Sequence, residues 1–209
     1  MKLCQQFIPK LKDHILGHLL DREYEGDTYG EFTDAERNTV LIAGEEIFHC
    51  KTLQVNYMTY DVRCNSDMIK PIIYLDVMVK SPEKGPHVQP YWYVCVIRIF
   101  HALVLSSHLG VKSKLCICME FLWVRWFGVE PGRYHHGFHL AHLPKIGFVE
   151  LSDEYTFTFL DSRQVIRGAH ITPAFSEGRT LTLLPATKSV AHVLQPDEKD
   201  DWVTFYMNM

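Results

Sequence analysis

The chain has 209 residues, a net charge of −4 and a hydrophobic share of 47%. This length and composition are typical of a folded globular protein with a sizeable core, and they exclude a disordered chain. No run of about 18 apolar residues occurs, so we expect no membrane-spanning segment. Acidic residues outnumber basic ones in the first 50 residues, and this imbalance makes that end of the chain a poor surface for nucleic acid.

The first predicted element is an amphipathic helix over Phe7–Leu20. Apolar side chains recur there every four residues, at Phe7, Leu11, Ile15 and Leu19. Their shared face needs a partner surface, either the rest of this chain or a neighbouring domain. An acidic loop follows, and Thr33–Glu36 has the form of a capping box for one short helical turn.

Most of the remaining chain alternates between turn signals and runs of β-branched and aromatic residues, which predicts strands. The predicted strands are 46–50, 53–60, 72–79, 91–101, 119–127, 145–149, 155–160 and 202–206. Asp161 is predicted to cap a helical turn over 162–166.

The predicted fold is therefore mainly β: a twisted, barrel-like module with an N-terminal amphipathic helix and few short helices. We expect three regions along the chain. Residues 1–44 hold the helix and the acidic loop, residues 45–175 form the β-rich module, and residues 176–209 are a polar tail with a short terminal strand.

Six cysteines, at positions 4, 50, 64, 95, 116 and 118, show neither a disulfide framework nor a CxxC pair. Reduced thiols inside a cell are the expected state. Charged residues interrupt the apolar stretch Phe7–Leu20, so it lacks the core of a cleavable signal peptide. These features predict an intracellular protein.

Large aromatic side chains crowd the two central predicted strands. Trp92 and Tyr93 lie at the start of one strand, and Trp123 and Trp126 lie in the other. The rings could line a pocket for a methylated ammonium group, because the face of an aromatic ring attracts cations. The alternative is packing in the core. These four residues form the candidate aromatic pocket.

Four arginines are candidates for contacts with an anionic partner: Arg125, Arg133, Arg163 and Arg167. If the fold brings them together, their guanidinium groups could bind phosphates or an acidic tail. Solvated surface is the alternative interpretation. Residues 91–180 are only mildly basic, so DNA is an alternative ligand and not the favoured one.

Neither a cofactor nor a catalytic centre is predicted. His135, His136, His139 and His142 lie close together, but no carboxylate or thiolate stands at ligand spacing beside them, and Cys116 and Cys118 lack a second pair. Whether the loop over 135–142 binds a metal stays open. The sequence contains no nucleophile elbow, His-Glu-x-x-His or phosphate-loop motif, so we predict no enzyme activity.

Several strings of residues resemble, in order, the C-terminal region of large proteins encoded by fungal DNA transposons of the Plavaka and Kyakuja–Dileera–Zisupton types. The strings are Phe7–His14, Phe32–Asp34, Asn56–Arg63, Pro90–Tyr93, Met119–Gly128, Gly147–Val149, Phe159–Asp161 and Val165–His170. None of them belongs to the catalytic transposase core of that family, so the resemblance implies no transposase activity. The chain departs from the family pattern at Cys64 and at Lys70–Ile73, which is consistent with drift in a stranded copy.

A second resemblance, over about residues 90–175, is to bromo-adjacent homology domains, β-rich modules that bind histone tails, nucleosomes or partner proteins. It depends on Trp92–Phe100, on Val124–Phe127 and on Val165–His170. Together the resemblances imply a non-enzymatic accessory module of a mobile-element protein that recognises chromatin or a protein partner in the nucleus. The alternatives are a DNA-binding module of a transposase-related protein and a decayed structural fragment without a ligand. The sequence leaves the oligomeric state open.

Overall fold

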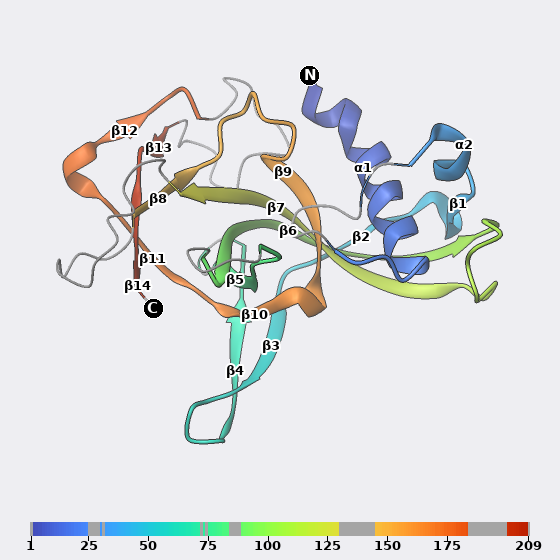
Figure 1. The fold of residues 1–209 in the computed structure, drawn as a ribbon, viewed down its shortest axis with the longest axis horizontal. Helices are drawn as coiled ribbons and strands as arrows, with labels where there is room; N and C mark the ends of the chain where they lie inside the picture. The colour runs from blue at the N-terminus through green and yellow to red at the C-terminus, as the bar shows by residue number, and fades with distance from the viewer. Residues whose placement is uncertain are drawn as a thin grey trace.

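The computed structural model describes residues 2–24, 30, 32–71, 73, 75–83, 89–129, 145–183 and 200–208. Its centre is a pair of long strands, β6 (Tyr91–Ser106) and β7 (Ile117–Val129), which pair antiparallel from Val94 with Trp126 to Val104 with Ile117 (Figure 1). Both predicted strands are confirmed and are longer than expected. The sequence after His101 continues the strand because Ala102 and Val104 are buried between more exposed neighbours.

Around this pair, the described strands form a nearly closed antiparallel barrel, which confirms the predicted mainly-β, barrel-like fold. The order along the sheet is β10 (Val165–Gly168), β5 (Asp76–Lys80), β6, β7, β8 (Lys145–Phe148), β14 (Phe205–Asn208) and β11 (His170–Pro173). The two ends of this order, β10 and β11, are consecutive in the chain and are separated by Ala169 alone. One continuous segment therefore links both edges of the sheet.

The other elements extend or flank this barrel. Strands β1 (Val40–Ile42) and β2 (Phe48–Cys50) pair with β6, and β9 (Phe157–Asp161) pairs with β7. Two separate hairpin-like pairs are β3 (Leu53–Met58) with β4 (Cys64–Ile69), and β12 (Arg179–Thr180) with β13 (Asp201–Trp202). The short helices are α2 (Asp34–Arg37), η1 (Ala43–Glu45), η2 (Ser162–Gln164) and η3 (Phe175–Glu177).

A bulge in β6 decides which side chains share a face. The register with β7 shifts between Val96 and Arg98, so one extra residue lies in β6. Even-numbered Val96 before the bulge and odd-numbered Ile99 after it therefore belong to the same buried cluster. On the opposite face, Tyr93 belongs to a cluster near β8 and β14, and Ala102 belongs to the cluster beneath the N-terminal helix.

The N-terminal helix α1 (Lys2–Leu19) docks on this last cluster, as its predicted amphipathic pattern required. Leu11, Ile15 and Leu16 are fully buried there, with Phe7 partly buried beside them. The helix begins five residues before the predicted start, so that Pro9 lies inside it. The Lys10 ammonium group donates a hydrogen bond to the carbonyl of Phe157 at 3.0 Å, which ties α1 to β9.

The capping motifs that the sequence predicted are present in α2 and η2. Thr33 Oγ1 accepts from the backbone N–H of Glu36, and Glu36 accepts from the backbone N–H of Thr33, which completes the capping box of α2. The Asp161 carboxylate accepts from the N–H of Arg163 at the start of η2. That helix is shorter than the predicted 162–166, because Val165 already begins β10.

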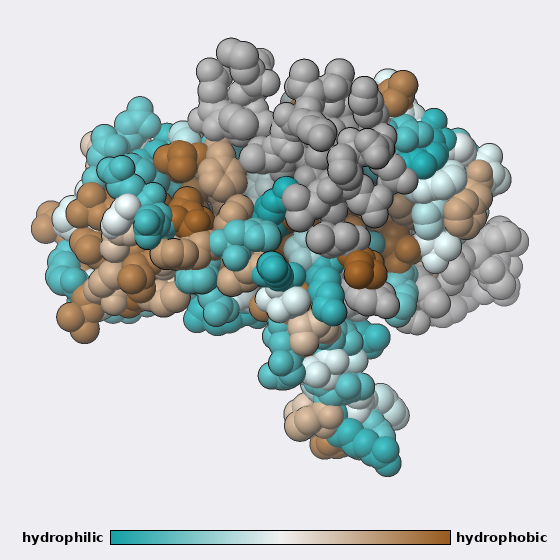
Figure 2. Space-filling model, turned by 180° about the vertical axis from the view of Figure 1, so that it is seen from behind, coloured by the Kyte–Doolittle hydropathy of each residue, from teal (hydrophilic) through white to brown (hydrophobic). Residues whose placement is uncertain are grey.

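The β3–β4 hairpin projects away from the barrel (Figures 1 and 2). Its tip is exposed and partly apolar, with Met58, Tyr60 and Val62 all more than half accessible to solvent. The sequence predicted β3 but not β4, since most side chains of β4 face water and the strand has no apolar alternation. The base of the hairpin returns to the barrel at Ile69, which is 2% exposed.

The sheet crosses both of the region boundaries that the sequence suggested. Strand β1 (Val40–Ile42), from residues 1–44, pairs with β6, and β14, from residues 176–209, pairs with β8 and β11. The predicted strand 72–79 is confirmed for the part that lies in β5, and the predicted strand 202–206 overlaps β13 and β14. Within the described residues, no helix has both the length and the apolar character needed to span a membrane.

Candidate functional site

The four aromatic residues of the candidate pocket do not converge on one site. Trp123 is 1% exposed and lies beneath α1, where its ring centroid is 4.8 Å from that of Phe159. Tyr93 belongs to the cluster near β8 and β14. Trp92 and Trp126 pack edge to face, with ring centroids 5.5 Å apart, in the cluster that also contains Val96 and Ile99. Because neighbouring strand residues point to opposite faces of the sheet, the four side chains are divided among three clusters.

Trp126 also satisfies its polar atom within the core. The Trp126 indole N–H donates to Thr158 Oγ1 at 2.7 Å, and both residues are buried. Trp92 is half-buried against the same cluster. The aromatic residues therefore pack the barrel and do not leave open ring faces together at one place.

Arg125 was predicted to contact an anionic partner, but it lies inside the protein and is 3% exposed. Its Nη1 donates to Asp201 Oδ2 at 2.5 Å, and its Nη2 donates to the carbonyl of Leu183 at 2.7 Å. The guanidinium carbon lies 3.7 Å from the centroid of the Phe148 ring. Burial lowers the pKa of Arg125, and the Asp201 carboxylate opposes this effect. This arginine joins β7 to β13, and although its Nε has no hydrogen-bond partner, its burial keeps the guanidinium group away from a partner surface.

The other predicted arginines are not clustered either. Arg163 is exposed but its guanidinium contacts the Asp161 carboxylate at 2.8 Å. Arg167 is exposed on β10 and lies over the Tyr57 ring, 5.3 Å from its centroid. Arg133 and the histidine-rich loop 135–142 lie outside the described residues. Arg167 borders a cavity.

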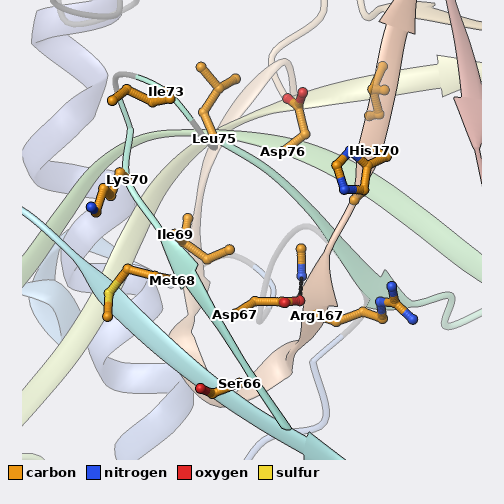
Figure 3. A pocket seen from close by; sticks show the side chains of 13 residues that line it. Ser66, Asp67, Met68, Ile69, Lys70, Ile73, Leu75, Asp76, Arg167 and His170 are labelled. Carbon is orange, nitrogen blue, oxygen red and sulfur yellow. Dashed lines mark hydrogen bonds between the residues drawn. The ribbon is translucent and has the colours of Figure 1, made fainter. Parts of the chain in front are cut away.

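That cavity has a volume of about 520 Å³ and lies where the base of the β3–β4 hairpin meets the barrel (Figure 3). Its walls come from β4, from the loop that leads into β5, and from the turn between β10 and β11. Figure 3 shows the apolar side chains Ile69, Ile73 and Leu75 along one side. Asp76, Arg167 and His170 lie along the other side.

A tight approach between β4 and β10 fixes one wall. The backbone N–H of Gly168 donates to Asp67 Oδ2 at 2.8 Å, and the Tyr57 hydroxyl donates to Asp67 Oδ1 at 3.2 Å. A side chain at residue 168 would bring its Cβ within 3.3 Å of Asp67 Oδ2, so this close approach favours glycine. Asp67 is therefore engaged in holding the hairpin against the barrel.

Asp76 differs from Asp67 in having no partner for its buried oxygen. Its Oδ1 is shielded from solvent, and no donor among the described residues reaches it. Its backbone carbonyl, in contrast, accepts from the N–H of Ala169 at 2.8 Å. Burial raises the pKa of Asp76 from 3.8 to about 7, because the charged form is poorly solvated. The carboxyl group can thus hold or release a proton near neutral pH.

The neighbours of Asp76 across the sheet are also buried. Asp76 lies opposite Cys95 in the β5–β6 register, and Cys95 lies opposite Arg125 in the β6–β7 register. Burial, and secondarily the Asp76 carboxylate, raises the pKa of the Cys95 thiol well above its usual value. Cys95 is therefore an unreactive, protonated thiol that separates Asp76 from Arg125.

Sequence reasoning missed this cavity because its walls come from three segments that are far apart in the chain. One signal was present: Asp76 interrupts the apolar run Ile72–Val79. An acidic residue inside a buried strand is uncommon unless it is paired or functional. Among the described residues, no group of three His, Cys, Asp or Glu side chains lies close enough to hold a metal ion. Comparisons of the chain with known protein families, with curated proteins and with solved structures found no match.

Proposed function

We propose that this chain is a non-enzymatic binding module that recognises a protein partner, chromatin included, through the cavity between β4, β5 and the β10–β11 turn. The observation that carries this proposal is a cavity of about 520 Å³ with an apolar wall, charged residues at its rim and an unpartnered carboxyl oxygen. Concave sites with few convergent polar groups are typical of ligand binding.

The resemblance to fungal transposon proteins supports the role of an accessory module of a mobile-element protein, acting in the nucleus. The absence of sequence motifs for nucleophilic, zinc or phosphate-loop chemistry favours binding over catalysis. The placement of the arginines favours a protein partner over DNA. Arg125 is buried and Arg163 is paired with Asp161, so they do not form the dense basic surface that binding to the phosphate backbone needs.

The test is binding of the purified full chain to reconstituted nucleosomes, compared with the same DNA free of histones, at near-physiological salt. We expect preferential binding to nucleosomes. Equal binding to both would instead assign a DNA-binding module, and binding to neither would leave a structural fragment without a ligand.

Two variants make the test specific for the cavity. Ile73→Glu introduces a charge on an apolar side chain that lines the cavity and is 65% exposed. Leu109→Glu makes the same kind of change at a residue that is 99% exposed in the connection between β6 and β7. We expect Ile73→Glu to weaken binding to nucleosomes about tenfold or more, while Leu109→Glu leaves it unchanged. Equal effects of the two variants would move the binding surface away from the cavity.

A further inference from the structure

The carboxyl group of Asp76 lacks what a buried carboxyl normally has. Buried polar atoms in folded proteins are nearly always hydrogen-bonded, and a buried carboxylate is normally paired with a cation. Asp76 Oδ1 has neither kind of partner among the described residues. Oδ1 itself is shielded, but Oδ2 is not among the shielded atoms and the residue is partly exposed, so a donor from outside the chain can reach the carboxyl group through the cavity that Asp76 lines.

The charged groups around Asp76 do not fill that role. On β6 it faces the Cys95 thiol, and Arg125 lies one strand further away and is paired with Asp201. From β4 and the following residue come Asp67 and Lys70, and from β10 and β11 come Arg167 and His170, all of which line the same cavity.

None of these groups acts as the counter-ion of Asp76. Burial alone accounts for its raised pKa, and no neighbouring cation lowers it. In Figure 3 the Lys70 ammonium and the Arg167 guanidinium point to opposite outer edges of the view. The cations therefore belong to the rim, and the carboxyl group lies apart from them.

The wall beside Asp76 is suited to an aliphatic chain. Ile69 is 2% exposed, while Leu75 and Ile171 are half-buried, and all three line the cavity. A lysine side chain carries four methylene groups that bury readily against such a surface, and it ends in a compact ammonium group with three donors. An arginine has a shorter stem of three methylene groups and a larger planar head, so it would cover less of this apolar wall.

We propose that the cavity binds the side chain of a lysine from a partner protein, with the ammonium group on the Asp76 carboxylate and the methylene chain against Leu75 and Ile171. This inference deepens the proposed function and rests on it. A bound ammonium group supplies the counter-ion that the carboxylate lacks, through the part of the carboxyl group that is not shielded from solvent. An acidic ligand would contact the cations of the rim and leave Asp76 Oδ1 unpaired.

The test uses a small probe and the full chain. The probe is Nα-acetyl-lysine methylamide, and its matched control carries a second acetyl group on the ε-nitrogen, which removes the charge. Binding is followed by chemical-shift changes of the backbone amides of Asp76 and Ala169. We expect the probe to bind and the doubly acetylated control to bind at least tenfold more weakly.

The pH dependence gives a second readout on the unmodified protein. The ammonium group of the probe stays charged between pH 6 and pH 8. Because the pKa of Asp76 is about 7 in the free protein, the ionised fraction rises from about one tenth to about nine tenths over this range. Affinity should therefore be about tenfold higher at pH 8 than at pH 6. His170 also lines the cavity, and a His170→Gln variant should keep this pH dependence.

Two substitutions separate the proposal from its rivals. Asp76→Asn should abolish binding of the probe while the chain stays folded, as judged by its amide spectrum. Arg167→Gln removes a cation of the rim and should leave the affinity unchanged or slightly higher. The proposal is overturned if the acetylated control binds equally, if Asp76→Asn keeps the affinity, or if Arg167→Gln abolishes binding. Nucleosome binding that survives Asp76→Asn would retain the proposed function and reject the lysine site.

Discussion

Replacing Asp76 by asparagine should change how the stability of the protein depends on pH. The pKa of this carboxyl is raised by burial, so the folded state favours its protonated form. Its contribution to stability is fully present below pH 3.8 and is lost as the pH rises towards 7, because the unfolded chain releases the proton first. Asparagine does not titrate, so the variant should not lose stability through this group.

The size of the effect follows from the two pKa values. The difference between 3.8 and about 7 corresponds to at most about 4 kcal/mol, since a tenfold change in an equilibrium constant equals about 1.4 kcal/mol. The residue is partly exposed, so relaxation and water will reduce this value. We expect the free energy of unfolding of Asp76→Asn, relative to the wild type, to increase by about 2–3 kcal/mol between pH 4.5 and pH 7.5.

Urea unfolding of both proteins at pH 4.5, 6.0 and 7.5 measures this difference directly. Other titrating groups, such as Glu36, are the same in both proteins and cancel in the comparison. An offset that is constant with pH would come from the new amide group and does not affect the argument. A difference that stays within about 0.5 kcal/mol across the range, or that falls as pH rises, would refute the assignment of Asp76 as a buried, unpaired carboxyl.

Two further pairs of substitutions, each comparing a buried residue with a more exposed one, test the placement of the predicted site residues, again by urea unfolding. Trp123→Ala should lower the free energy of unfolding by about 3–5 kcal/mol, because its ring is fully buried. Trp92→Ala should lower it by less, because that ring is half-buried. Equal small losses in the two variants would argue against this packing. Arg125→Met should lower the free energy of unfolding by about 2–4 kcal/mol, because it leaves the carboxylate of Asp201 unpaired. Arg167→Met should change it by less than about 0.5 kcal/mol. Similar losses for the two arginine variants would contradict the different burial of these side chains.

The sequence could predict the elements whose buried face carries a regular pattern of apolar residues. The helix around Leu11 and Ile15, and the strands β6 and β7, have strong periodicity and large apolar side chains, so local sequence was sufficient. It could not predict the bulge after Val96, which depends on the pairing with β7. Nor could it predict β4, since a strand exposed on most of its side chains has no apolar alternation to detect.

The candidate site was harder to predict because it is built from non-local contacts. Composition identified Trp92, Tyr93, Trp123 and Trp126 as notable, but alternation along the strands and the packing of α1 assign them to three different clusters. The cavity forms where β4, β5 and the β10–β11 turn lie against one another, and the absence of a side chain at Gly168 allows β10 to approach β4 closely. Asp76, an acidic residue in the apolar run that ends at Val79, was the one local signal for the cavity.

The docking of α1 on β9 has a consequence for the nascent chain. The hydrogen bond between Lys10 and Phe157 spans 147 residues, which a ribosome adds in roughly 7–30 s at about 5–20 residues per second. Throughout this interval the apolar face of α1, including Leu11 and Ile15, has no β9 to cover it. Barrel closure waits longer still, for β14 to enter between β8 and β11. We therefore expect the growing polypeptide to depend on chaperones that hold apolar helices, and to aggregate when synthesis outpaces them.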